Sequence, residues 1–222
     1  MNHMPVTERQ LQVWSDAYAA CPQRRLATRA LSKCDLNDVA FVRAGAQAMR
    51  QKFSLEIETL EVTNQQSSGR CWLFAALNVL RERIAKEKNL EAFELSQSYL
   101  AFWDKFERCN YFLESMLETA SLPTDDRTVA HILHTGVHDG GQWDMFVNVV
   151  RKYGVVPKDA FDETYQSSHT AAMNRVLNQS LKACAARLRA MVAAGEGEDA
   201  IQAEKESMLG RIYGFLCSCY GE

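Results

Sequence analysis

The fold of this chain is decided by one stretch, where a polar run passes directly into an apolar helical pattern: Thr63-Asn64-Gln65-Gln66-Ser67-Ser68-Gly69-Arg70-Cys71-Trp72-Leu73-Phe74. A cysteine stands at the junction. Apolar residues recur at helical spacing after it, so the sequence predicts that Cys71 lies at a helix N-terminus. Unpaired backbone N–H groups and the positive end of the helix dipole stabilise a thiolate there. Because a thiolate is a nucleophile, Cys71 is the candidate catalytic residue.

Gln65, six residues before Cys71, carries a neutral amide donor. If the Ser-Ser-Gly run folds back, this amide and the Cys71 backbone N–H can point at one carbonyl oxygen and form an oxyanion hole. Such a donor is worth about 2.7–4 kcal/mol. Gly69 suits the close turn because it has no Cβ. The alternative is that Cys71 is a small buried apolar residue, as free cysteines commonly are.

The composition argues against several kinds of partner. The chain has 222 residues, with 25 basic and 28 acidic side chains and a net charge of -3. No strong field favours nucleic acid, so we expect no nucleic-acid partner. No run of 18 apolar residues and no basic-then-apolar leader is present, so neither a membrane partner nor secretion is expected.

The cysteines indicate a reducing compartment. They are seven in number and lack paired spacing, at Cys21, Cys34, Cys71, Cys109, Cys184, Cys217 and Cys219. This pattern fits free thiols better than a disulfide framework. We therefore expect a cytoplasmic protein.

Helical patterns dominate the rest of the chain. Thr7 is expected to cap a first helix, residues 36–53 have helical spacing, and residues 55–62 alternate as a short extended segment. The helix from Cys71 is expected to place Arg81, Glu82, Arg83 and Lys86 on its outer face. Ser96 is expected to cap a helix that reaches Thr119.

Four more segments complete the prediction. Residues 145–153 read as a helix ended by Gly154, and residues 174–192 as an amphipathic helix. Residues 193–200 read as a loop. The last segment has an apolar face near Ile212 and Phe215 that is expected to lack a partner. The predicted regions are a helical lead-in (1–62), a nucleophile-bearing region (63–192), and a loop with the start of a helical insertion (193–222).

A histidine cluster suggests a separate hypothesis, a zinc site. His131, His134 and His138 fall at i, i+3 and i+7, beside Asp139. On one continuous helix they would share a face and could hold zinc. Gly136 interrupts the helical pattern, however, so the favoured reading has no metal, and no organic cofactor is implied either.

The stretch around Cys71 resembles the nucleophile segment of papain-like cysteine peptidases, in which Gln precedes Cys-Trp by the same interval. The string Asn64 to Trp72 is most similar to the bleomycin hydrolase branch, whose bacterial members are called aminopeptidase C. Further resemblances are Glu94-Leu95-Ser96-Gln97 and the segment Lys152 to Pro157. In this family the Gly140-Gly141 pair would correspond to the strand that binds substrate backbone beside the nucleophile.

The resemblance implies a papain-like α+β fold, of which this chain is the mostly helical part. It also implies a cytosolic thiol peptidase that removes amino-terminal residues from peptides and hydrolyses bleomycin amide and homocysteine thiolactone. The implied partners are peptide or small amide substrates and, in a homo-hexamer, other copies of the chain.

The histidine base of such an enzyme is not evident in this chain. It is expected about 130–150 residues after the nucleophile in compact family members, and the last histidine here is His169. We therefore expect the chain to be an incomplete part of the enzyme, with the β-rich half that carries His and Asn missing. The alternative is an inactive peptidase remnant that serves as an interaction or assembly module.

Overall fold

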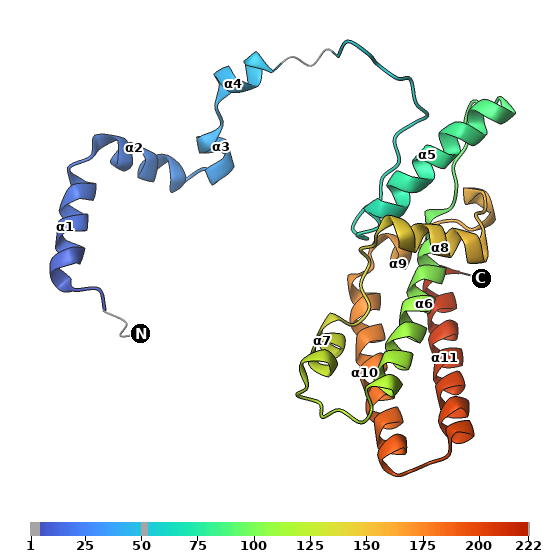
Figure 1. Cartoon of the computed structure of the whole chain (residues 1–222). Helices are drawn as coiled ribbons and strands as arrows, with labels where there is room; N and C mark the ends of the chain where they lie inside the picture. Colours follow the sequence, from blue (N-terminus) through green and yellow to red (C-terminus); the bar gives the residue numbers. More distant parts are fainter. Residues whose placement is uncertain (1–4, 50–52, 222) are drawn as a thin grey trace. The chain divides into compact units, whose positions relative to one another are not determined.

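The computed structural model describes residues 5–49 and 53–221, and helices make up most of it (Figure 1). The chain divides into two compact units, Met1–Ile57 and Glu58–Glu222. Within the described ranges, β-structure is limited to two isolated bridges, Ser67 with His169 and Leu95 with Pro157. The prediction of a mostly helical chain is confirmed. No helix in these ranges is long and apolar enough to cross a membrane.

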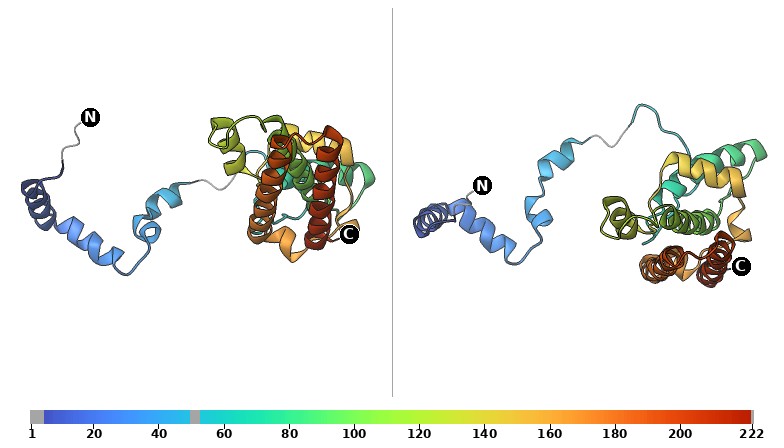
Figure 2. Two further views of the ribbon diagram at one scale, coloured as in Figure 1. Left: turned by 90° about the horizontal axis from the view of Figure 1, so that it is seen from below. Right: turned by 60° about the horizontal axis from the view of Figure 1, so that its bottom comes forward.

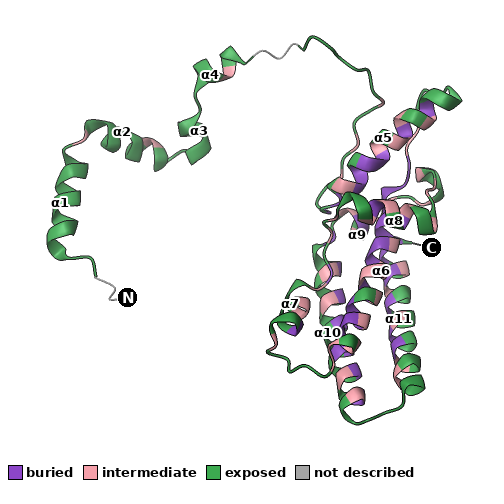
Figure 3. Ribbon diagram, in the orientation of Figure 1, coloured by how far each residue is buried: buried purple, intermediate pink, exposed green. Residues whose placement is uncertain are grey.

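In the part of it that the structure describes, the first unit consists of short helices without a core. Thr7 caps the first of them as predicted, because its hydroxyl accepts the Gln10 backbone N–H and the Gln10 side chain accepts the Thr7 N–H. None of the helices in this unit has a buried residue (Figure 3). They are α1 (Glu8–Ala19), α2 (Pro22–Leu31), α3 (Leu36–Ala40) and α4 (Arg43–Ala48).

The single helix predicted for residues 36–53 is wrong. Phe41 and Val42 are extended, with ψ of 119° and 92°, and they separate α3 from α4. A β-branched residue favours extended backbone, and no buried face compensates for it here. Residues 50–52 of the predicted helix lie outside the described residues.

The second unit is organised around one long helix, α6 (Gln97–Glu118). Helices α10 and α11 form a hairpin that packs on α6, which also contacts α5, α7 and α8 (Figure 2). The bounds of the helices in this unit besides α6 are α5 (Cys71–Lys88), α7 (Arg127–Thr135), α8 (Trp143–Tyr153), η1 (Lys158–Ala160), α9 (Tyr165–Ser168), α10 (Ala171–Ala193) and α11 (Glu198–Tyr220).

The ends of these helices follow local chemistry. Ser96 caps α6 as predicted, with its hydroxyl accepting the Tyr99 backbone N–H at 3.0 Å. Asn89 ends α5 in the left-handed region at φ 54°, which asparagine tolerates better than most residues. Gly154, at φ 74°, ends α8 as predicted.

The apolar stripe predicted for residues 174–192 packs in one core with apolar residues of α6. Leu177, Leu181 and Leu188 of α10 are buried, and so are Leu100 and Leu113 of α6. The prediction of an unpartnered face near Ile212 and Phe215 is wrong. Ile212 is buried and Phe215 packs partly against the core, because α11 continues from Glu198 and lies along α6 and α10.

Two further predictions need correction. The loop predicted for residues 193–200 spans only 194–197, since α10 runs to Ala193 and α11 begins at Glu198. Arg81 is not on the outer face of α5: it is 5% exposed and donates to the carbonyls of Leu60 and Glu61 at 3.4 and 2.5 Å. These carbonyls, together with the Glu82 carboxylate 3.8 Å from the Arg81 Nε, explain how a guanidinium is tolerated in the interior, since a buried charge needs polar partners.

Candidate active site

Cys71 is the first residue of α5, and its side chain is exposed. Arg70 occupies the N-cap position, and no side chain caps this end of the helix. The Arg70 carbonyl accepts the backbone N–H groups of Leu73 and Phe74 at 2.9 and 3.1 Å. The first backbone N–H groups of a helix have no partner within it, so they remain available to an anion at this end. The predicted place of the thiol at an open helix N-terminus is confirmed.

The loop before Cys71 is bent back by two residues with positive φ. Gln66 has φ 54° and Gly69 has φ 61°. The Ser68 hydroxyl donates to the Gln65 carbonyl at 2.6 Å and closes the turn. Gln65 itself is half-buried, and its Oε1 lies in the interior without a hydrogen-bond partner among the described residues. The Ser-Ser-Gly run therefore folds back, as the oxyanion hypothesis for Gln65 requires.

Arg70 anchors this loop to a distant segment. Its guanidinium donates to both carboxylate oxygens of Glu163 at 3.0 and 2.9 Å, and its Nε donates to the Ser68 hydroxyl at 2.8 Å. The Arg70 side chain is 2% exposed. Ser167 and Ser168 also donate to Glu163. A partly buried two-point ion pair with further hydrogen bonds to its carboxylate fixes both partners in one geometry.

Trp72, the residue after Cys71, is held by the segment that contains the paired glycines. Its indole N–H donates to the Asp139 carbonyl at 2.7 Å. A Cβ added to Gly141 would lie 2.5–2.7 Å from three atoms of the Trp72 ring, so only glycine fits there. At Gly140 the nearest atom to such a Cβ is 3.6 Å away, which is ordinary contact. The prediction explained both glycines by substrate approach, whereas the packing on Trp72 already requires Gly141.

The zinc hypothesis is wrong. Helix α7 carries His131 and His134 but ends at Thr135, and Gly136, at φ 55°, turns the chain before His138. All three histidines are exposed. Across residues 5–49 and 53–221, no group of three His, Cys, Asp or Glu side chains is placed to hold a metal ion.

Asp139 instead accepts hydrogen bonds from three side chains. Lys105 donates to Oδ1 at 2.7 Å, while Thr170 and Asn174 donate to Oδ2 at 2.8 and 2.7 Å. Burial by itself raises the pKa of Asp139. The charge of Lys105 and the three hydrogen bonds outweigh burial and hold that pKa below its usual range.

His169 does not reach the thiol. Its ring stacks on Tyr165 with the centroids 4.4 Å apart, and its Nδ1 lies 3.2 Å from the Tyr165 carbonyl. Its backbone forms the bridge to Ser67, and the Ser67 N–H donates to the Ser168 carbonyl at 3.0 Å. In the described part of the chain, no histidine is hydrogen bonded to Cys71.

Comparison with known proteins agrees with this geometry. The model of the peptidase C1-like family matches residues 5–222. This chain belongs to that family. The resemblance predicted from residues 63–74 is therefore confirmed.

Several members of the family are closely similar to this chain. Human bleomycin hydrolase is 43% identical over 204 residues, which are 90% of this chain and 45% of that protein. Aminopeptidase C from Listeria monocytogenes is 42% identical over 217 residues, which are 98% of this chain and 48% of that protein. The crystal structure of PepW from Lactobacillus rhamnosis HN001 matches with a TM-score of 0.93 and 41% identity, over 98% of this chain and 49% of that one. The chain thus spans about half the length of these relatives.

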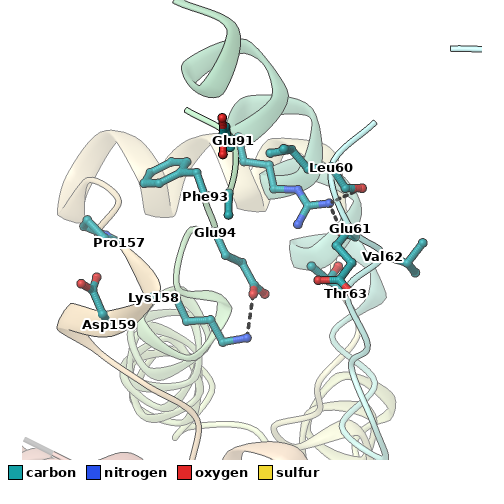
Figure 4. A pocket seen from close by; sticks show the side chains of 12 residues that line it. Leu60, Glu61, Val62, Thr63, Glu91, Phe93, Glu94, Pro157, Lys158 and Asp159 are labelled. Atoms are coloured by element: carbon teal, nitrogen blue, oxygen red, sulfur yellow. Dashed lines mark hydrogen bonds and ion pairs between the residues drawn. The ribbon is translucent and has the colours of Figure 1, made fainter. Parts of the chain in front are cut away.

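Cys71 lines neither of two cavities in this family member. The first, about 660 Å³, lies between residues 60–63 and the segments 91–94 and 157–159, where Lys158 pairs with Glu94 at 2.7 Å (Figure 4). The second, about 690 Å³, lies between α6, α7 and α8. These two cavities therefore do not identify the site, and the candidate rests on the helix end and its contacts.

Sequence reasoning missed the side chains that hold the Cys71 loop: Arg70, Glu163, Lys105, Thr170 and Asn174. A signal existed for Lys105, because it falls in the apolar stripe of α6 between Ala101 and Cys109 at intervals of four. A charge in such a stripe predicts a buried ion pair. No comparable signal marks Glu163.

Proposed function

We propose that this chain carries the nucleophile of a thiol peptidase of the bleomycin hydrolase and aminopeptidase C type. The supporting observation is the exposed Cys71 thiol at the open N-terminus of α5, a helix of 18 residues. Membership of the peptidase C1-like family and the similarity to human bleomycin hydrolase support the same reaction class. The activity is the removal of amino-terminal residues from peptides.

In this proposal the Cys71 thiolate attacks the substrate carbonyl carbon and forms a C–S bond. The carbonyl oxygen becomes an oxyanion, which accepts hydrogen bonds from the Gln65 amide and the Cys71 backbone N–H. When the C–N bond breaks, a histidine donates a proton to the leaving amine. Water then hydrolyses the thioester and restores the thiol.

The substrate backbone lies along Gly140 in this proposal. That glycine is exposed, and its surroundings leave room for an approaching strand. Small amides such as bleomycin and the thioester-like homocysteine thiolactone are further substrates of the proposed enzyme. A cytosolic location and assembly into a ring of six copies also belong to the proposal.

The histidine base and its orienting asparagine come from residues outside the printed sequence. Support comes from the described histidines, since His131, His134 and His138 are exposed and His169 stacks on Tyr165. General acid–base catalysis typically contributes about 10²–10⁴ in rate. Residues 1–222 alone are therefore expected to show no turnover.

The test compares the complete gene product with residues 1–222 on aminoacyl fluorogenic substrates. We expect turnover by the complete product and its loss in Cys71→Ala. The matched control is Cys34→Ala, which removes another exposed thiol and should retain full activity. A gene product that ends at residue 222 and is inactive would replace the proposal with the peptidase remnant. Cys71-dependent turnover by residues 1–222 would return His131, His134, His138 and His169 as candidate bases.

A further inference from the structure

Asp139 contacts the chain on both sides of Cys71. On the carboxyl-terminal side, its carbonyl accepts the Trp72 indole N–H at 2.7 Å. On the amino-terminal side, the Asp139 side chain lies against Gly69. A Cβ added to Gly69 would lie 3.1 Å from the Asp139 Cβ. A displacement of Asp139 would therefore move the residues that flank the thiol.

Three side chains from two helices determine where Asp139 lies. Lys105, from the middle of α6, is 3% exposed, and its ammonium also donates to the Asn174 side-chain oxygen at 2.7 Å. Thr170, just before α10, donates to Asp139 and also lies 3.4 Å from the Ser68 carbonyl. Because Lys105 and Asn174 project from packed helices, the Asp139 carboxylate has one position available.

The sequence gives no catalytic reason for a lysine at this place. Lys105 occupies a core position of α6, where an apolar side chain would avoid the cost of burying a charge. Replacement of a buried ion pair by apolar groups is often neutral or stabilising. What the pair supplies is a fixed direction for Asp139, and Asp139 in turn contacts the loop that carries Cys71.

We propose that Lys105 and Asp139 are positioning residues for the Cys71 nucleophile. Lys105 holds the Asp139 carboxylate, Asp139 holds Trp72 and Gly69, and these two residues set the direction of the thiol. The inference rests on the proposed function, because it concerns the orientation of the same nucleophile. It predicts a larger effect on the chemical step than on substrate binding at the neighbouring Gly140.

The main test is the double variant Lys105→Met with Asp139→Asn in the complete gene product, which removes both charges together. A misplacement of about 1 Å can cost about 10²-fold in rate. We therefore expect kcat to fall by about tenfold to a hundredfold, with KM within about twofold of wild type. A fall in kcat without a change in KM separates positioning from lost substrate binding.

The matched control is Lys205→Met. Lys205 is also buried and also pairs with a carboxylate of α6, Glu114, but this pair makes no hydrogen bond to residues 63–74. The Lys205→Met variant should have a lower melting temperature than wild type and an unchanged kcat. If the double variant does not fold, Thr170→Val and Thr170→Ser replace it. The valine should lower kcat and the serine, which keeps the hydroxyl, should restore it.

A second measurement does not depend on turnover. In the ¹H–¹⁵N spectrum of residues 1–222, the Trp72 indole resonance, assigned with Trp72→Phe, should shift in the double variant and stay in place in Lys205→Met. If the complete wild-type gene product is inactive, the proposed function is overturned, and so is the assignment of Lys105 and Asp139 as positioning residues. Wild-type activity with an unchanged kcat in the double variant, or with an equal fall in Lys205→Met, would overturn the positioning assignment alone.

Discussion

Arg70, the residue directly before Cys71, forms a two-point ion pair with Glu163, which is 93 residues further along the chain. The pair joins the nucleophile loop to the segment that leads into α9. Its geometry is of the kind that makes arginine, and not lysine, the suitable partner for a carboxylate.

Glu163→Gln should destabilise the chain strongly. It leaves the Arg70 guanidinium, which is 2% exposed, without its counter-ion. Breaking a fully buried pair in this way costs about 3–5 kcal/mol, and the loss here is smaller because Glu163 is 22% exposed. Urea unfolding followed by circular dichroism measures the change. Glu87→Gln is the control, since it breaks the exposed pair with Arg83 and should not change the midpoint. Equal midpoints for Glu163→Gln and wild type would contradict the role given to this pair.

The two neighbouring glycines should respond differently to alanine. Gly141→Ala forces a Cβ against the Trp72 ring and should destabilise by about 1–3 kcal/mol, with a shift in tryptophan fluorescence. Gly140→Ala meets no close atom and should keep wild-type stability. In the complete gene product, Gly140→Ala should raise KM for peptides if substrate lies there. Unfolding of both variants at the same denaturant concentration would contradict the different roles given to Gly140 and Gly141.

Two tyrosines offer a test of buried hydroxyl groups. The Tyr220 hydroxyl is buried without a hydrogen-bond partner in the described part of the structure, and burial raises its pKa above the usual range. The Tyr99 hydroxyl, in contrast, donates to the Tyr153 carbonyl at 2.8 Å. Tyr220→Phe should therefore stabilise the chain by about 1–3 kcal/mol, because it removes an unsatisfied polar group.

Tyr99→Phe should have the opposite sign, with a loss of about 0.5–1.5 kcal/mol for a hydrogen bond removed. Thermal unfolding of the two variants gives the comparison, since both delete one oxygen atom from a ring of the core. A lower melting temperature for Tyr220→Phe would show that its hydroxyl is satisfied.

Local sequence signals predicted α5, α6, α8 and α10 because those signals act within a few residues. The Ser96 cap, the Gly154 stop and the stripe from Leu177 to Met191 each correspond to an observed feature. The predicted solvent exposure of Arg81 and Ile212 was wrong. The local pattern does not show that Leu60 and Glu61 contact Arg81, or that α6 and α10 pack on the helix of Ile212.

The candidate site shows the same division. The position of Cys71 at a helix start and the bend at Gly69 were predicted from adjacent residues. The contacts that hold the loop were not, because Lys105 and Asp139 are 34 residues apart and Arg70 and Glu163 are 93 apart. The zinc hypothesis included Asp139 because it follows His138 in the sequence. In the structure, Asp139 instead accepts hydrogen bonds from Lys105, Thr170 and Asn174.

The acid stability of the chain should depend on two aspartates with opposite signs. The folded-state pKa of Asp139 is lowered below its unfolded value, which is about 3.9. Its contribution to stability is thus fully present above about pH 4 and is lost as the pH falls through the folded pKa. Asp139→Asn should therefore be less stable than wild type at neutral pH, and the difference should shrink as the medium becomes acidic.

Asp104 should behave in the reverse way. Burial raises its pKa, and the nearby charge of Arg108, which donates to it at 2.8 Å, only partly offsets this. Because its folded pKa lies above the unfolded value, wild type should gain stability relative to Asp104→Asn as the pH falls through that folded pKa. Urea midpoints of the three proteins between about pH 7 and pH 3 give the two difference curves. Curves that slope in the same direction would contradict the opposite pKa shifts of the two carboxylates, in which burial outweighs the neighbouring charges at Asp104, whereas the Lys105 charge and three hydrogen bonds outweigh burial at Asp139.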